Sequence, residues 1–122
     1  MEETTPTFDT LDISVDGRIG RLTLTQPDQL NPLGTVPLAE LARAAAWFDT
    51  TDVSVVVVTG AGRAFSSGFD RREFADGSTA TPHENRAQAD LGRQMAEAME
   101  RMRALTIAAI KGPCVGGGVV LA

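Results

Sequence analysis

The chain has 122 residues, of which 43% are hydrophobic, and its formal net charge at pH 7 is −5. This length is enough for one domain at most, and because no apolar run is long enough to cross a bilayer, we expect a soluble protein with no membrane partner. The acidic balance offers no basic face for nucleic acid, and the single cysteine, Cys114, cannot form an internal disulfide, which is compatible with a cytoplasmic location.

The first ten residues predict a flexible N-terminal tail. They are acidic and rich in threonine, and they lack the basic start and the apolar core of a secretory leader. The folded part is expected to span residues 11–122. It begins with two stretches, Leu11–Val15 and Ile19–Leu24, that alternate apolar and polar residues on either side of Asp16 and Gly17. This pattern predicts a β-hairpin with one buried face.

A loop, a helix and a strand are predicted next. Residues 26–34 hold two prolines and Asn31 and therefore predict a loop. Thr35 is then expected to cap a helix, because apolar residues recur after it at helical spacing. These residues are Leu38, Leu41, Ala42, Ala45 and Phe48. Residues 55–58 are four consecutive valines, and such a run without polar alternation predicts a strand that is buried on both faces.

The residues that follow this strand, Ala64–Asp70, are the first candidate for chemistry, and we call them the first loop. Proteins of the α/β class bind their ligands just past the carboxyl ends of such strands. Three small residues at positions 66–68 would let a ligand approach the backbone closely. Asp70 can serve as the N-cap of a following helix, which would leave peptide N–H groups near Phe69 without partners in that helix. Such groups attract anions.

A second stretch, Gly112–Gly118, repeats this arrangement, and we call it the second loop. It comes after an apolar strand predicted over Thr106–Ile110, and it opens an apolar helix. Backbone donors from two such loops can hold one oxygen atom between them. The alternative for the second loop is tight packing of glycines without any chemistry, but that alternative does not account for the first loop.

Between the two loops the sequence predicts a surface loop and a long helix. Residues 75–82 consist largely of Gly, Ser, Thr and Ala, which favours a mobile loop. Residues 84–104 predict a helix that carries one apolar stripe. The stripe consists of Leu91, Met95, Met99 (or Ala98) and Met102. A methionine stripe at this spacing is most often part of a hydrophobic core, and the alternative is that part of it lines a pocket for an apolar ligand.

At these two loops the sequence resembles the crotonase superfamily, which has the enoyl-CoA hydratase/isomerase fold. The first signature of that family reads roughly A-F-x-A/S-G-x-D-hydrophobic-x-x-hydrophobic and matches Ala64–Phe74, and the second reads G-x-x-x-G-G-G and matches Gly112–Gly118. Residues 26–33 are similar to a further family segment, R/N-P-x-x-x-N-A-L. The resemblance implies an α/β fold, a crotonase-like spiral of ββα units that is incomplete in this chain. Residues 11–122 would then be the N-terminal portion of an acyl-CoA-binding domain.

The resemblance also implies a site and a reaction. The backbone N–H groups of Phe69 and Gly117 would form an oxyanion hole that stabilises the enolate of an acyl-CoA thioester. Coenzyme A, as part of the substrate and not as a separate cofactor, would contact Ser67, Gly68, Asp70 and Arg72. The acyl pocket would be lined by Phe74, Met95 and Met99. No metal is expected, and the complete protein would be a homotrimer or a dimer of trimers.

One departure from the family bears on the type of enzyme. Val120 stands where typical hydratases carry one of their two catalytic Glu residues, and the other Glu would lie beyond Ala122. Valine cannot transfer a proton, so a simple hydratase is disfavoured. An isomerase-like, synthase-like or hydrolase-like member with a single later carboxylate fits better. The alternative is a non-catalytic binding or assembly subunit with the same fold. Because an apolar helix has only begun at Ala122, we also expect that part of the fold lies outside these residues.

Overall fold

The computed structural model describes residues 5–70 and 82–122 of the chain. In chain order the elements are β1 (Leu11–Asp16), β2 (Ile19–Leu24), a short 3-10 helix η1 (Pro27–Gln29), β3 (Pro32–Leu33), α1 (Thr35–Phe48), β4 (Val55–Gly60), β5 (Gly68–Phe69), α3 (Pro82–Arg101), β6 (Leu105–Ala108) and α4 (Gly117–Leu121). The chain combines helices with a sheet that has parallel strands, so the predicted α/β class is confirmed. None of the helices in the described ranges has both the length and the apolar composition that crossing a membrane requires.

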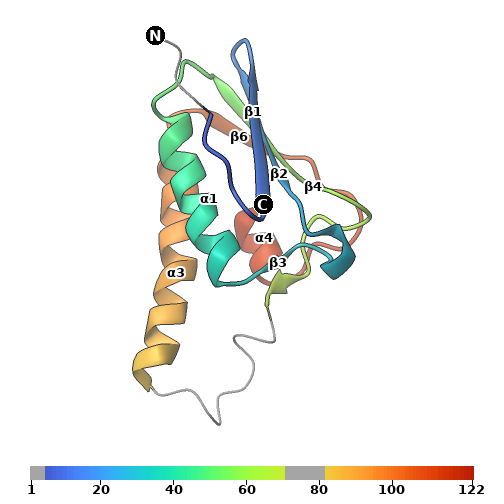
Figure 1. Cartoon of the computed structure of the whole chain (residues 1–122), viewed down its shortest axis with the longest axis vertical. Coiled ribbons are helices and arrows are strands. Elements are labelled where there is room, and N and C mark those ends of the chain that lie inside the picture. Colours follow the sequence, from blue (N-terminus) through green and yellow to red (C-terminus); the bar gives the residue numbers. More distant parts are fainter. Residues whose placement is uncertain (1–4, 71–81) are drawn as a thin grey trace.

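Four of the strands form one sheet in the order β1-β2-β4-β6. β1 and β2 are antiparallel and form the predicted hairpin, in which Leu11 pairs with Leu24. β4 is parallel to both of its neighbours, β2 and β6. The helices α1 and α3 pack against each other beside this sheet (Figure 1). Because β4 and β6 are parallel neighbours, the loops that follow them leave the sheet at the same end.

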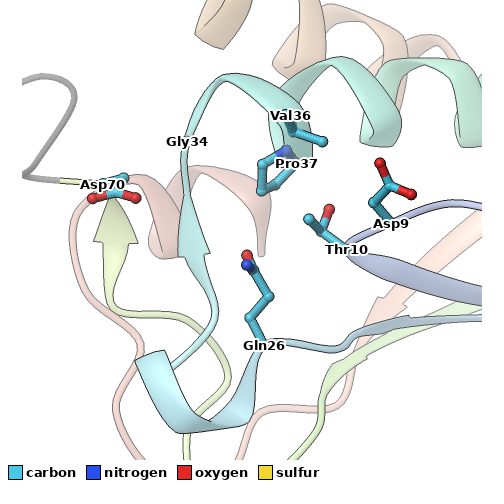
Figure 2. Close-up of a pocket in the computed structure, with 7 residues that line it drawn as sticks. All are labelled: Asp9, Thr10, Gln26, Gly34, Val36, Pro37 and Asp70. Carbon is cyan, nitrogen blue, oxygen red and sulfur yellow. The ribbon is translucent and has the colours of Figure 1, made fainter.

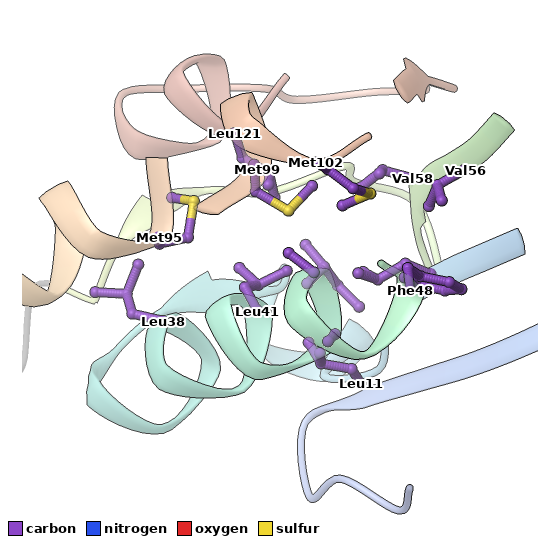
Figure 3. Packing of buried hydrophobic residues seen from close by; sticks show 14 of the residues in the cluster. Leu11, Leu38, Leu41, Phe48, Val56, Val58, Met95, Met99, Met102 and Leu121 are labelled. Carbon is purple, nitrogen blue, oxygen red and sulfur yellow. The ribbon is translucent and has the colours of Figure 1, made fainter. Parts of the chain in front are cut away.

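The hydrophobic core lies between the two long helices and the sheet (Figure 3). α1 contributes Leu38, Leu41 and Phe48, all of which are fully buried. Met95 from α3 lies across from Leu38 in the same cluster (Figure 3). Burying one such side chain stabilises a fold by about 1.5–3 kcal/mol. This shared core holds β4 and α3 in fixed positions. The first loop follows β4 in the chain, and the second loop leads into α4, which contacts α3.

The start of α1 differs from the prediction by one residue. Thr35 was expected to be the cap, but the N-cap is Gly34 and Thr35 is the first helical residue. No side-chain hydrogen bond caps the helix, and the carbonyl oxygen of Gly34 instead accepts the first helical hydrogen bond, from the N–H group of Leu38. A glycine takes the extended conformation of an N-cap easily, which explains why the threonine was not needed there.

The prediction that the valine strand is buried on both faces is wrong. Val56 and Val58 are buried, whereas Val55 and Val57 are only half-buried. The less buried face continues on β6 with Leu105, which pairs with Val55 and is 65% exposed. The physical reason is that, among the described residues, the helices cover only the other face of the sheet.

The last residues of the predicted tail are held in place by Glu40 of α1. The Glu40 carboxylate accepts hydrogen bonds from the backbone N–H groups of Asp9, at 2.7 Å, and Thr10, at 2.8 Å. The hydroxyl group of Thr10 also donates to it. Both Glu40 and Thr10 are buried, and a buried carboxylate is stable only when such donors are present. These bonds fasten the segment before β1 to the helix.

The exposed apolar side chains of β6 and α4 predict self-association of the 122-residue chain. Leu105, Ile107, Val119 and Val120 are all about half exposed or more, and β6 is an edge strand of the four-stranded sheet. Edge strands with apolar side chains pair readily with other chains. We expect sedimentation to detect oligomers or aggregates of the native chain, and a larger monomer fraction for Leu105→Lys. Val36→Lys is the matched control.

Val36 is also exposed, but it lies on α1, away from β6. The control should therefore leave the monomer fraction unchanged. Equal monomer fractions for the native chain and Leu105→Lys would show that β6 does not drive association.

Candidate functional site

The two candidate loops lie side by side, which confirms the placement that the sequence predicts. The N–H groups of Phe65 and Ser66 both donate to the carbonyl oxygen of Pro113, at 3.0 and 3.3 Å. The N–H group of Val115 donates in return to the carbonyl oxygen of Ser66, at 3.1 Å. Ser66 and Cys114 form an isolated parallel bridge. The backbones of the first and second loops therefore run alongside each other past the ends of β4 and β6.

Glycine is required where these backbones approach most closely. A Cβ atom on Gly118 would lie 2.9 Å from the carbonyl oxygen of Ser66, and one on Gly68 would lie 2.6 Å from that of Val115. Both distances are shorter than a normal van der Waals contact, and both neighbours are backbone atoms. Gly68 also has a φ angle of +93°, which residues with a side chain rarely adopt. The small residues of the two signatures thus allow α4 to touch the first loop.

The two residues predicted to form the oxyanion hole are in direct contact. Gly117 is the first residue of α4, so its N–H group has no acceptor within that helix. The aromatic ring of Phe69 lies against it, because a Cβ atom on Gly117 would be 3.0 Å from Cε2 of the ring. The structure therefore brings Phe69 and Gly117 together from positions 48 residues apart in the sequence. Their role as hydrogen-bond donors to a ligand stays a prediction.

Ser66 has a structural task that sequence reasoning missed. The small residues at positions 66–68 were expected to leave space for a ligand, but Ser66 is fully buried. Its hydroxyl group donates to the carbonyl oxygen of Asn31, at 2.8 Å, and accepts from the N–H group of Gly68, at 3.1 Å. Ser66 therefore fixes the backbone of the first loop three residues before Phe69.

Asn31 is the second residue whose importance the sequence did not reveal. It is buried and has a φ angle of +53°. Its side-chain amide donates to the carbonyl oxygens of Ala61 and Ala64, both at 3.0 Å, and its side-chain oxygen accepts from the N–H group of Gln26, at 2.9 Å. Asn31 thus ties the loop after β2 to the segment that leads into the first loop.

Of the other predicted coenzyme A contacts, Ser67 and Asp70 lie within the described residues and Arg72 does not. Ser67 is exposed, and its N–H group donates to the carbonyl oxygen of Leu30, at 2.8 Å. Asp70 is half-buried, and its N–H group donates to the carbonyl oxygen of Leu33, at 3.1 Å. Arg72 lies outside the described residues, and so does Phe74, which was predicted to line the acyl pocket.

The two methionines predicted for the acyl pocket lie in the hydrophobic core. Met95 is fully buried and Met99 is nearly so (Figure 3). This is the placement that the sequence pattern favoured for a methionine stripe, and the role of the two residues as an acyl pocket stays a prediction. Val120, in contrast, is 57% exposed on α4, so its side chain is accessible but cannot transfer a proton.

A cavity of about 260 Å³ lies beside the first loop, between the N-terminal segment, the loop after β2 and the start of α1 (Figure 2). It is lined by Asp9, Thr10, Gln26, Gly34, Val36, Pro37 and Asp70. Of the predicted site residues that the structure describes, only Asp70 lines it. The sequence did not predict this cavity, because its walls come from four separate segments. Within residues 5–70 and 82–122, no group of three His, Cys, Asp or Glu residues could hold a metal ion.

Comparison with known proteins identifies relatives over nearly the whole chain. The sequence profile described as Enoyl-CoA hydratase/isomerase matches residues 15–122. A Mycobacterium tuberculosis protein named "Probable enoyl-CoA hydratase echA8" is 34% identical over 117 residues, which cover 95% of this chain and 44% of that protein. The peroxisomal Delta(3,5)-Delta(2,4)-dienoyl-CoA isomerase of Arabidopsis thaliana is also 34% identical, covering 97% of this chain and 47% of its own length.

Solved structures agree with the sequence comparison. The crystal structure of an enoyl-CoA hydratase/carnithine racemase from Magnetospirillum magneticum superimposes with a TM-score of 0.87 at 34% identity, covering 95% of this chain and 44% of that one. A second structure, an enoyl-CoA hydratase/isomerase from Mycobacterium paratuberculosis, gives a TM-score of 0.81 at 33% identity and covers 93% and 46%. The chain thus spans less than half the length of these relatives. The two paired glycine loops agree with these matches. The chain belongs to the enoyl-CoA hydratase/isomerase family, and its structure corresponds to the N-terminal part of the crotonase fold.

Proposed function

We propose that the chain supplies the thioester-binding part of an enzyme that acts on acyl-CoA. The observation that carries this proposal is the pairing of the two loops, which brings Phe69 and the first residue of α4, Gly117, into contact. In the proposed complex, the thioester oxygen accepts hydrogen bonds from both backbone N–H groups. Coenzyme A lies along Ser67, Gly68 and Asp70 and reaches Arg72.

The chemistry follows from where negative charge develops. Loss of a proton next to a thioester carbonyl gives an enolate, in which the charge moves onto the oxygen atom. Donors aimed at that oxygen stabilise the enolate more than the ground state, and removing one such donor typically costs about 2.7–4 kcal/mol in the activation free energy. The chain would hold the oxygen, and an acid or base from elsewhere in the complete protein would move the proton.

The valine at position 120 restricts the type of reaction that the proposed site could catalyse. Its exposed side chain lies on the same short helix as Gly117, at a distance of three residues along the chain. A carboxylate at this position could move a proton near the bound thioester, whereas a valine cannot. We therefore favour an isomerase-like reaction or another reaction with a single carboxylate over simple hydration.

A non-catalytic binding or assembly subunit is the second candidate, and the same observation at Val120 favours it. The two candidates differ in whether the complete protein turns over an enoyl-CoA. In either case the assembly is proposed to be a homotrimer or a dimer of trimers in the cytoplasm.

The proposal is tested by asking whether binding depends on the thioester oxygen. We suggest calorimetric titration of the chain with crotonyl-CoA and with its thioether analogue, in which a CH2 group replaces the carbonyl group. Two hydrogen bonds of about 1 kcal/mol each would make crotonyl-CoA bind roughly tenfold or more tightly than the thioether. Equal affinities would contradict the proposed oxyanion hole, and the absence of binding by either would contradict coenzyme A recognition as a whole.

Arg72→Ala is expected to weaken the binding of coenzyme A modestly. The expectation rests on the sequence, where Arg72 matches a basic position of the family near the phosphates. An ion pair exposed to solvent contributes about 0–1 kcal/mol, so the loss of affinity should be at most several-fold and should shrink as salt is added. Calorimetry at low and high salt measures both effects. An affinity that is unchanged at low salt would remove Arg72 from the site.

A further inference from the structure

The side chain of Phe69 occupies an unusual position for an aromatic residue. It is 39% exposed, yet its ring packs against glycines of two different helices. A Cβ atom on Gly117 of α4 would lie 3.0–3.1 Å from three ring atoms, Cε2, Cδ2 and Cε1. A Cβ atom on Gly92 of α3 would lie 3.4 Å from Cε1 and Cζ. The ring therefore fills the space that two glycines leave between α3 and α4.

This position matters because the ring contacts Gly117, whose N–H group would bind the carbonyl oxygen of the substrate. A carbonyl oxygen that accepts a hydrogen bond from the N–H group of Gly117 lies about 2.9 Å from that nitrogen. The carbon atoms attached to the carbonyl follow directly behind the oxygen. The ring of Phe69 lies against Gly117, so it is close to the space that these carbon atoms would enter.

The Phe69 side chain is therefore not fully enclosed by the described residues. A core residue would be covered on all sides, whereas more than a third of Phe69 remains accessible among the described residues. A rigid apolar wall favours a narrow acyl group, because a branched or bulky group would have to displace the ring from between two helices that pack together.

We propose that the side chain of Phe69 determines specificity by limiting the width of the acyl group beside the thioester. The proposal rests on the proposed function, since it assigns the bound carbonyl to the N–H groups of Phe69 and Gly117. It adds a separate role for the Phe69 side chain, which selects narrow, unbranched acyl groups over wide ones. Truncation of the ring would open a pocket whose far walls are Gly92 and Gly117.

The test compares acyl-CoA affinities of the native chain and Phe69→Ala. Crotonyl-CoA serves as the narrow ligand and cinnamoyl-CoA, with its phenyl group, as the wide one, and calorimetry measures both affinities. The ratio of the crotonyl-CoA affinity to the cinnamoyl-CoA affinity should fall by about tenfold or more in Phe69→Ala, in the range that pocket size typically produces. Phe69→Leu, which keeps a smaller apolar side chain between α3 and α4, should give a smaller change in the same direction.

Gly92→Ala is the matched control. Its Cβ atom would lie at an ordinary contact distance of 3.4 Å from the ring, on the side of α3, so the native ratio should be kept. In the double variant with Phe69→Ala, the added methyl group should restore part of the native ratio.

The outcomes separate this inference from the proposed function. If Phe69→Ala and Phe69→Leu bind both ligands with the native ratio, the inference about Phe69 is wrong while coenzyme A recognition stands. If the native chain binds neither ligand, both the inference and the proposed function are wrong. A shift in the ratio that Gly92→Ala reproduces by itself would also overturn the inference, because general loosening of the helices would then explain it.

Discussion

Gly112→Ala is expected to lower the free energy of unfolding by about 3–5 kcal/mol, the sum of a strained backbone and a severe steric clash. Gly112 has a φ angle of +65°, which costs about 1–2 kcal/mol for a residue with a Cβ atom. That Cβ atom would also lie 1.9 Å from the carbonyl oxygen of Arg63. A Cβ atom is fixed to its backbone and the carbonyl oxygen is a backbone atom, so relief requires the two paired segments to move apart. Urea unfolding followed by circular dichroism measures the loss.

Gly116→Ala is the matched control in the same loop. Gly116 also has a positive φ angle, of +52°, but a Cβ atom on it would have no neighbour within 4 Å among the described residues. Its ψ angle of −117° lies outside the left-handed helical region, so this variant should show backbone strain alone, a loss of about 1–3 kcal/mol. If Gly112→Ala and Gly116→Ala lose equal stability, the close approach of the loops at Gly112 and Arg63 is not a constraint in solution.

Asn31→Ala should be the second most damaging substitution, with an expected loss of about 3–4 kcal/mol. The substitution removes three hydrogen bonds and leaves Ala61 O, Ala64 O and Gln26 N without their partner in partly or fully buried positions. A buried polar group without a partner costs about 1–3 kcal/mol. Alanine would also be strained at the φ angle of +53°, which asparagine tolerates better.

Asn31→Gly separates these two causes. Glycine adopts positive φ angles freely, so this variant loses the hydrogen bonds without the strain. It should be more stable than Asn31→Ala by about 1 kcal/mol and still clearly less stable than the native chain. A native-like melting curve for Asn31→Gly would mean that the side-chain amide does not hold the first loop. Both variants should also weaken the binding of crotonyl-CoA, because Asn31 contacts the segment that leads into that loop.

The features that follow a regular pattern could be predicted from the sequence. Alternation of apolar residues located the hairpin, and helical spacing located α1 and α3 within a few residues. The placement of the two loops side by side could also be predicted, from the order of the two motifs that resemble the family's signatures and from the strand before each of them. Here the strands are β4 and β6, and the hydrogen bonds around Pro113 and Ser66 confirm the result.

The features that depend on contacts between distant segments could not be predicted. Asn31 appeared as a loop residue, and nothing local indicated that its amide reaches carbonyl groups 30 and 33 residues away. Ser66 looked like a small residue next to a ligand, but it is a buried hydrogen-bonding residue. The position of the Phe69 ring depends on the absence of a side chain at Gly117, which only the packing of α4 against the first loop reveals.

The same reasoning explains the error at the valine strand. A run of four valines predicts burial on both faces only if elements exist to cover both. The described residues supply helices for one face, and Val55 and Val57 remain half-buried on the other. A local run of apolar residues favours burial, but whether a face is buried depends on which elements of the fold pack against it.

The most direct test of the central claim is infrared difference spectroscopy of crotonyl-CoA that carries a 13C label in the thioester carbonyl group. Gly117→Ala and Gly117→Pro are compared with the native chain. Both variants add a Cβ atom beside the Phe69 ring, but only proline removes the N–H group, and proline is well tolerated at the first position of a helix.

Hydrogen bonds to the carbonyl oxygen weaken the C=O bond and lower its stretching frequency. The account predicts that the band moves to lower frequency when the native chain or Gly117→Ala binds the ligand, and that Gly117→Pro loses a large part of this shift. A carbonyl band of bound crotonyl-CoA at the same frequency in Gly117→Ala and Gly117→Pro would contradict the claim that the Gly117 N–H group holds the thioester oxygen.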